Sequence, residues 1–115
     1  MAITLNASTP VDFGVEGRRS FKIWSVSGPA SYTTGGTTFT PAEVSMSRIF
    51  YCIALGGFYN GTSITFAVLP APAADGTQNL LFAGGAASGV VLAQITAATN
   101  LSAYVGLIKV VGTGL

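Results

Sequence analysis

Apolar and polar residues alternate along several short segments of the chain. In RRSFKIWSV, residues 18–26, Phe21 and Ile23 face one side, whereas Lys22, Trp24 and Val26 face the other. This two-residue period is typical of a β-strand. Apolar runs of similar length, separated by Gly-, Pro- or Asn-containing turns, occupy residues 48–55, 63–69, 78–83, 90–96 and 101–111. Short strands joined by such turns predict an all-β fold, either an antiparallel β-sandwich or a jelly-roll-like barrel.

The segment RIFYCIAL, residues 48–55, is apolar on both sides of the predicted strand. Ile49, Tyr51 and Ile53 fall on one face, and Phe50 and Cys52 fall on the other. Apolar residues on both faces are typical of a strand at the centre of a sheet that is covered on both sides. The pattern therefore predicts a central strand, with Cys52 as a small buried hydrophobic residue.

One helix-start signal, Thr40-Pro41-Ala42-Glu43, interrupts this strand-rich pattern. Thr40 can cap the first amides of a helix, Pro41 suits the first helical position, and Glu43 can accept a hydrogen bond from the Thr40 amide. The residues that follow, at 45–47, are poor helix formers, so the helix must be short. We expect one helical turn near residues 41–45, closed by a capping box, as a corner before the strand at 48–55.

The length and the order of the segments predict a single domain. A chain of 115 residues is long enough for one modest core. Residues 1–17 are mixed and turn-prone, and they are predicted to form an N-terminal arm ahead of a β-domain at 18–115. The first residues lack a basic region followed by a continuous apolar core, so no signal peptide is expected, and synthesis in a cytoplasm is the default expectation.

The composition indicates that much of the surface is apolar. Half of the residues are hydrophobic and only 8% are charged, against roughly a quarter in an ordinary soluble domain. Soluble monomers seldom expose apolar patches larger than a few hundred Å². We therefore expect part of this surface to be buried against other chains. The net charge of +1 predicts neither a nucleic-acid partner nor an anionic membrane surface.

The candidate chemistry is sparse. The chain has no His and one Cys, which excludes a Ser/His or Cys/His catalytic pair, a His-containing zinc site and an intramolecular disulfide. Of the four carboxylates, Glu43 is assigned to the cap and Asp75 to a turn, and Asp12 and Glu16 lie in the predicted arm without a visible cleft. These features predict a protein that is not an enzyme and that needs no cofactor or metal.

The basic residues Arg18, Arg19 and Lys22 form one cluster, with three of the five positive charges within five positions. A nucleic-acid face normally needs more charge, with aromatic residues for stacking. Two other interpretations are that Arg18 and Lys22 keep a strand edge soluble, and that the cluster contacts an acidic patch on a protein partner.

The order GRRSFKIWSV, SYTTGG and FTPAEVSMSRI, within residues 17–50, resembles a family of capsid decoration, or head cement, proteins of tailed bacteriophages. The resemblance implies a β-sandwich with an N-terminal arm that binds the outside of an assembled phage head as a homotrimer. It also implies a non-enzymatic virion protein that bridges subunits of the major capsid protein, after synthesis in the host bacterial cytoplasm. The residues expected to contact the capsid are Asp12, Phe13, Arg18 and Arg19.

Two other functions remain open from the sequence. A head- or tail-fibre module of a phage could hold a carbohydrate on the GGFYNGT segment, with Phe58, Tyr59 and Asn60 as the contact residues. A membrane span is suggested by the uncharged stretch LLFAGGAASGVVLAQITAA, which is long enough to cross a bilayer. Its central glycines and the two-residue period of its flanks argue against such a span.

Overall fold

The alternating segments of the sequence form strands in the computed structural model, which describes residues 4–32, 36–62, 64–84, 93–94 and 98–113. All ladders between these strands are antiparallel. The strands are β1 (Thr4–Leu5), β2 (Asp12–Glu16), β3 (Arg19–Ser27), β4 (Thr37–Phe39), β5 (Arg48–Ala54), β6 (Phe58–Tyr59), β7 (Ile64–Val68), β8 (Gln78–Gly84), β9 (Ala93–Gln94) and β10 (Val105–Thr113).

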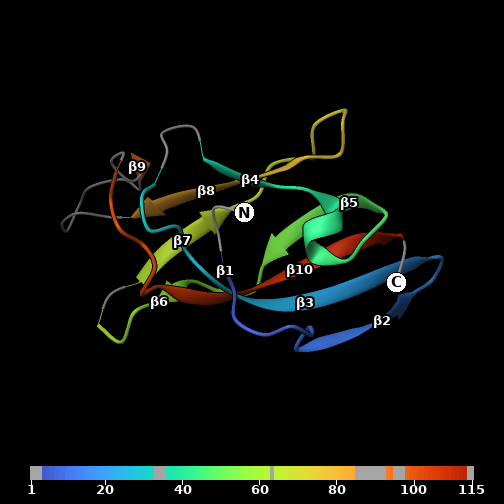
Figure 1. Cartoon of the computed structure of the whole chain (residues 1–115), viewed down its shortest axis with the longest axis horizontal. Coiled ribbons are helices and arrows are strands. Elements are labelled where there is room, and N and C mark those ends of the chain that lie inside the picture. The colour runs from blue at the N-terminus through green and yellow to red at the C-terminus, as the bar shows by residue number, and fades with distance from the viewer. Residues whose placement is uncertain (1–3, 33–35, 63, 85–92, 95–97, 114–115) are drawn as a thin grey trace.

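The strands form one curled sheet with the order β1-β3-β10-β6-β7-β8-β4 (Figure 1). Strand β2 pairs with β3, β5 pairs with β10, and β9 pairs with β8. The sheet bends into a half-barrel, so the prediction of an all-β antiparallel fold is confirmed.

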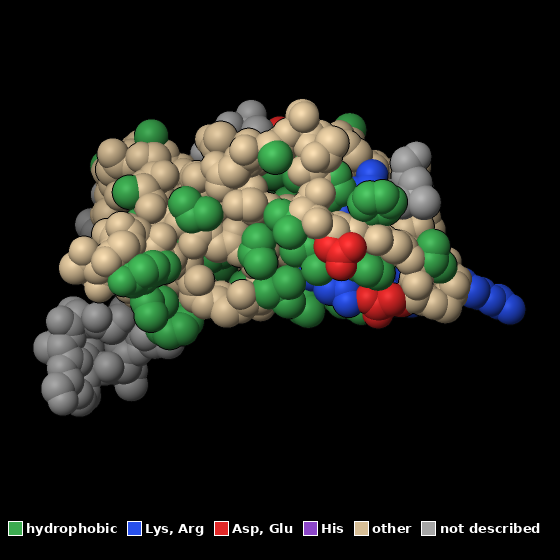
Figure 2. Space-filling model, turned by 90° about the horizontal axis from the view of Figure 1, so that it is seen from below, with side chains coloured by type: hydrophobic (Ala, Val, Ile, Leu, Met, Phe, Trp, Pro, Cys, Tyr) green, Lys and Arg blue, Asp and Glu red, His purple; other side chains and the backbone are tan. Residues whose placement is uncertain are grey.

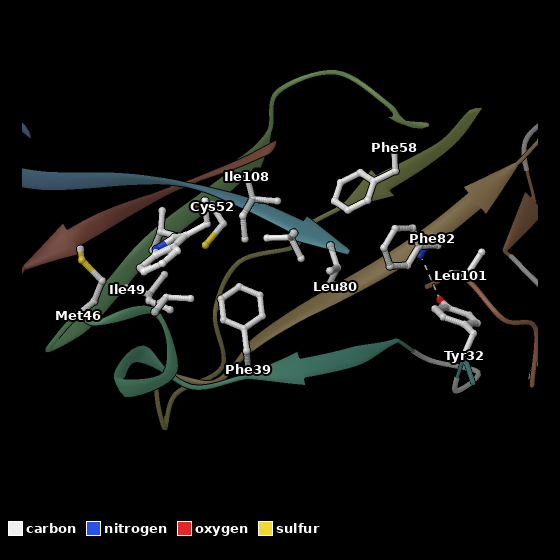
Figure 3. Close-up of a cluster of buried hydrophobic side chains, with 14 residues drawn as sticks. Tyr32, Phe39, Met46, Ile49, Cys52, Phe58, Leu80, Phe82, Leu101 and Ile108 are labelled. Atoms are coloured by element: carbon white, nitrogen blue, oxygen red, sulfur yellow. Dashed lines mark hydrogen bonds between the residues drawn. The ribbon is translucent and has the colours of Figure 1, made fainter. Parts of the chain in front are cut away.

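The core lies on the inner face of the half-barrel. Trp24 and Ile108 are cross-strand partners on β3 and β10, and both are buried. They face Phe39 on β4 and Leu80 and Phe82 on β8, and Figure 3 shows the labelled side chains converging between the two halves of the sheet. Burial of a side chain of this size contributes about 1.5–3 kcal/mol, so this cluster is the main source of stability.

An aromatic group closes one end of this core. The ring of Phe82 makes edge-to-face contacts with Phe58 and Tyr32, with centroids 5.1 Å and 6.0 Å apart. The Phe82 amide donates to the Tyr32 hydroxyl over 3.2 Å, which provides a partner for the polar atom of a buried side chain.

The helix-start signal forms a single 3₁₀ turn, η1 (Pro41–Val44), and the predicted helical turn near residues 41–45 is confirmed. Val44 is fully buried in the core cluster. The turn ends at Ser45, which has the left-handed φ of 60°. The Ser45 carbonyl accepts a 2.6 Å hydrogen bond from Nζ of the buried Lys22. This bond joins the turn to β3.

Strand β5 differs from the prediction of a central, doubly covered strand. It pairs only with β10 among the described strands, so it is an edge strand. The register shifts at Gly112, leaving Phe50 as the extra residue of a β-bulge. The bulge turns both Ile49 and Cys52 inward, whereas Tyr51 stays outward and 40% exposed. A strict two-residue period predicts Ile49 and Tyr51 on the same face. This prediction is wrong, because the extra residue of the bulge puts them on opposite faces.

The segment predicted to be an arm contains β1 and β2, and both strands pair with β3. Asn6 reinforces this pairing, because its side chain donates to Ser25 Oγ over 3.1 Å and accepts from Ser27 Oγ over 2.8 Å. In this structure the described part of residues 1–17 therefore extends the sheet beside β3. The predicted strand at residues 90–96 is described only as β9, and its other residues lie outside the described part.

Candidate binding surfaces

The outer face of the half-barrel is apolar as well as the inner one. Cross-strand partners share a face. The pairs Val111–Tyr51, Lys109–Ile53 and Val105–Tyr59 therefore put the side chains of Tyr51, Ile53 and Tyr59 on the outer face of the sheet. The pair Tyr59–Ile64 carries this face onto β7. We use the name outer apolar face for its exposed members, which are Tyr51, Ile53, Leu55, Tyr59, Ile64, Phe66, Val68 and Val105.

The members of the outer apolar face are between 40% and 56% exposed. Figure 2 shows hydrophobic side chains next to a small group of acidic and basic ones on the side of the molecule that is seen from below. Single exposed apolar residues are ordinary, but a contiguous apolar face on a soluble protein usually marks an interaction site. The sequence pattern contained this signal, because the strands are apolar at both odd and even positions.

An ion pair lies on the same side of the sheet. Lys109 Nζ pairs with Glu16 Oε1 and also lies 4.8 Å from the ring centre of Phe21. The Phe21 ring covers Gly14, where an added Cβ would lie 2.9 Å from the ring. Glycine at position 14 therefore lets the ring lie flat on β2, and the ring supports the lysine.

The four residues predicted to contact a capsid all lie on the β2–β3 hairpin, but they do not form one site. Asp12 pairs with Ile23, whereas Arg19 pairs with Glu16, so the two ends are four residues apart along the ladder, roughly 13 Å. Asp12 and Phe13 are exposed on opposite faces of β2. Arg18 lies in the exposed turn at the tip. The hairpin thus presents an apolar and acidic end and a basic end.

The side of β2 that carries Phe13 also presents Val11 and Val15. These three side chains are between 62% and 64% exposed and lie beyond the edge of the core. They form a second, smaller apolar surface, which we call the β2 ledge. Phe13 is predicted from the sequence to contact a partner, whereas Val11 and Val15 are not, although the alternation of VDFGV contains the signal.

The carboxylates of the turns have structural partners. Glu43 Oε1 accepts hydrogen bonds from the Thr40 amide (2.9 Å) and the Thr40 hydroxyl (3.2 Å). The amide bond is the main cause that lowers the pKa of Glu43. Asp75 accepts from the Thr77 amide over 3.0 Å, which lowers the pKa of Asp75. Both carboxylates are held ionised by local turn geometry, which is the opposite of what a general acid needs.

Cys52 is also unsuited to nucleophilic chemistry. Its side chain is buried, and burial raises the pKa of the thiol to about 12. A reactive cysteine needs a lowered pKa and an electropositive environment.

The structure corrects the proposed carbohydrate contacts. Phe58 is fully buried and packs edge-to-face on Phe82, so it cannot stack on a sugar ring. The Asn60 side chain accepts a hydrogen bond from the Thr62 amide in a local turn. Tyr59 is 52% exposed, and its hydroxyl donates to the Gly61 carbonyl. Tyr59 is therefore the exposed aromatic residue of the three.

Within the described residues there is no group of three or more Cys, Asp or Glu side chains that could hold a metal ion. No helix in that part of the chain is long and apolar enough to cross a membrane. No protein-family model, curated protein or solved structure matches the chain. The apolar surfaces and the basic end of the hairpin are therefore the features from which a function is argued.

Proposed function

We propose that this chain is a structural protein of a phage virion that binds the outer surface of the assembled head and stabilises it by bridging major capsid subunits. In this proposal the chain is made in the host bacterial cytoplasm and attaches to the shell as a homotrimer. It acts by binding and performs no catalysis.

The outer apolar face is the observation that supports this proposal most directly. A small β-domain with few charges gains solubility and stability when such a face is buried against copies of itself, as in a closed symmetric assembly. The resemblance of residues 17–50 to capsid decoration proteins supports the same class of function.

The surfaces suggest a division of tasks in this proposal. The outer apolar face packs between the copies of the trimer, and the β2–β3 hairpin of each copy contacts the shell through Asp12, Phe13, Arg18 and Arg19. Three hairpins held in one trimer attach together, so each weak contact is reinforced by the other two. Bridging of neighbouring capsid subunits in this way opposes their separation.

A density map of the intact virion that carries this chain tests the proposal. We expect the domain to appear as three-fold projections on the outer surface of the head, with the hairpin toward the shell. A chain found on the tail, or absent from the particle, contradicts the proposal. A monomer at high concentration in solution contradicts the assignment of the outer apolar face to the trimer.

A further inference from the structure

Two arginines share one aromatic ring at the end of the sheet where the β2–β3 hairpin turns. The guanidinium carbon of Arg19 lies 4.6 Å from the ring centre of Phe50, and that of Arg48 lies 4.9 Å from it. Arg19 begins β3 and Arg48 begins β5, and these strands pair with β10 on either side near Gly112. The two arginines are therefore brought together by the sheet across about 30 residues of sequence.

The ring that both arginines contact belongs to the residue of the β-bulge. Phe50 is the residue without a partner in the β5–β10 ladder, and it is half-buried. Bulges commonly redirect a side chain near a functional site. The bulge depends on Gly112, because a Cβ there would overlap the Arg48 carbonyl oxygen.

Neither arginine is neutralised within the described residues, since neither forms a salt bridge there. Glu16, the cross-strand partner of Arg19, is paired with Lys109 instead. Asp75 is held by the Thr77 amide. Two exposed guanidinium groups held against one ring, without an acid, leave hydrogen-bond donors that match a carboxylate.

A pocket of about 350 Å³ adjoins this pair. One wall is the start of β5, from Arg48 to Phe50, and the other is the loop between β7 and β8. The loop residues are Ala71, Pro72, Ala73, Ala74 and Gly76. Apart from Arg48, these residues have apolar or small side chains, so the pocket has room for a side chain of a bound segment next to the charged group.

We propose that Arg19, Phe50 and Arg48, with the pocket beside them, bind an acidic peptide segment of a partner protein. Carboxylates of the peptide pair with the guanidinium groups, and a neighbouring side chain enters the pocket. Nucleic acid fits less well, because the Phe50 ring is already covered by the arginines and the chain has only five basic residues. That the partner is a capsid subunit rests on the function proposed above, whereas the site itself does not.

Fluorescence anisotropy with the full chain tests this site. The probe is a labelled peptide Glu-Glu-Leu-Glu-Glu with blocked termini, and the comparison peptides replace Glu by Gln or Leu by Gly. We expect saturable binding of the acidic peptide, weaker binding of the Gly version, and no binding of the Gln version. Arg48→Gln and Arg19→Gln should each weaken binding about tenfold, because each removes a charge-assisted pair.

Ser102→Ala is the control, because Ser102 is exposed and precedes β10 at the end of that strand away from Arg19 and Arg48, and it should change binding less than twofold. Arg48→Lys should restore little affinity, because it keeps the charge and loses the planar fork. Equal binding of the Glu and Gln peptides, or an equal loss from Ser102→Ala, overturns the proposal. Tighter binding of oligodeoxythymidylate with the same dependence on Arg19 and Arg48 overturns it in favour of nucleic acid.

The peptide experiment and the virion map test two separate proposals, so a negative result in one does not decide the other. Absence of peptide binding by a chain that is seen on the head overturns only the acidic-peptide site. A chain absent from the head that still binds the peptide through Arg19 and Arg48 overturns only the proposed location.

Discussion

Glu43 accepts hydrogen bonds from both the amide and the hydroxyl of Thr40, and its pKa is lowered mainly by the amide bond. A carboxylate whose pKa is lowered by folding stabilises the native state above its unfolded pKa, and the stabilisation is lost as the pH falls through the folded pKa. We therefore expect Glu43→Gln to be less stable than the wild type at pH 7. The difference should shrink as the pH falls below about 4.5.

Urea unfolding of both proteins between pH 7 and pH 3 measures this difference. Asp75 also has a lowered pKa, but it is present in both proteins, so its contribution cancels. A difference that stays constant with pH contradicts a role for the ionised carboxylate.

Thr40→Ala should lower the free energy of unfolding by about 1 kcal/mol at pH 7. Peptide binding should not change, because the cap lies outside the proposed site.

Phe58 and Tyr59 are neighbours with opposite environments. Phe58→Ala should lower the free energy of unfolding by about 3–5 kcal/mol, because it removes a fully buried ring that contacts Phe82. Tyr59→Ala should cost far less, since the ring is half in solvent. Chemical denaturation measures both values, and similar losses from the two variants would contradict the assignment of faces.

At the scale of the elements, the bulge in β5 depends on a close approach of two backbones. Gly112→Ala should destabilise the fold by more than about 2 kcal/mol, because the obstacle to the new Cβ is the Arg48 backbone, which cannot rotate away. Gly17→Ala is the control, since it has φ of 63° but open space around the new Cβ, and it should cost about 1 kcal/mol from the backbone conformation alone. Thermal unfolding of the two variants tests this order.

The elements that could be predicted from the sequence are those with a regular period. The predicted strands at 18–26 and 63–69 alternate, and that at 78–83 is a short apolar run; they overlap strands β3, β7 and β8. The bulge at Phe50 could not be predicted, because it depends on how β5 meets Gly112, more than 60 positions away. Strand β6 lies between the apolar runs at 48–55 and 63–69, where the sequence predicts only a turn, because two residues alone pair there and glycines surround them.

The proposed peptide site shows the same limit. Arg18 and Arg19 were singled out from their adjacency in the sequence, but Arg48 and Phe50 were not, since nothing local relates them to the hairpin. The sheet brings these residues together only when β3 and β5 pair with the same strand, β10. A local pattern cannot report a contact of that range.

At the scale of the whole molecule, the outer apolar face predicts the behaviour in solution. If it packs between copies, Phe66→Lys should convert a trimer into a monomer, because the lysine would bury an unpaired charge. Light scattering after size-exclusion chromatography measures the mass. Phe13→Lys is the matched control on the β2 ledge, and it should keep the trimer. A trimer in both variants assigns the contact to another surface.

Cys52 is the one cysteine of the chain, and it is buried, so its reaction with a thiol reagent reports opening of the half-barrel. The thiolate is the reactive form, and burial both shields the sulfur and raises the pKa of the thiol to about 12. Labelling by a thiol reagent therefore requires the sheet to separate around β5. The labelling rate of the free domain, compared with that of the assembled form, measures how strongly assembly suppresses these excursions.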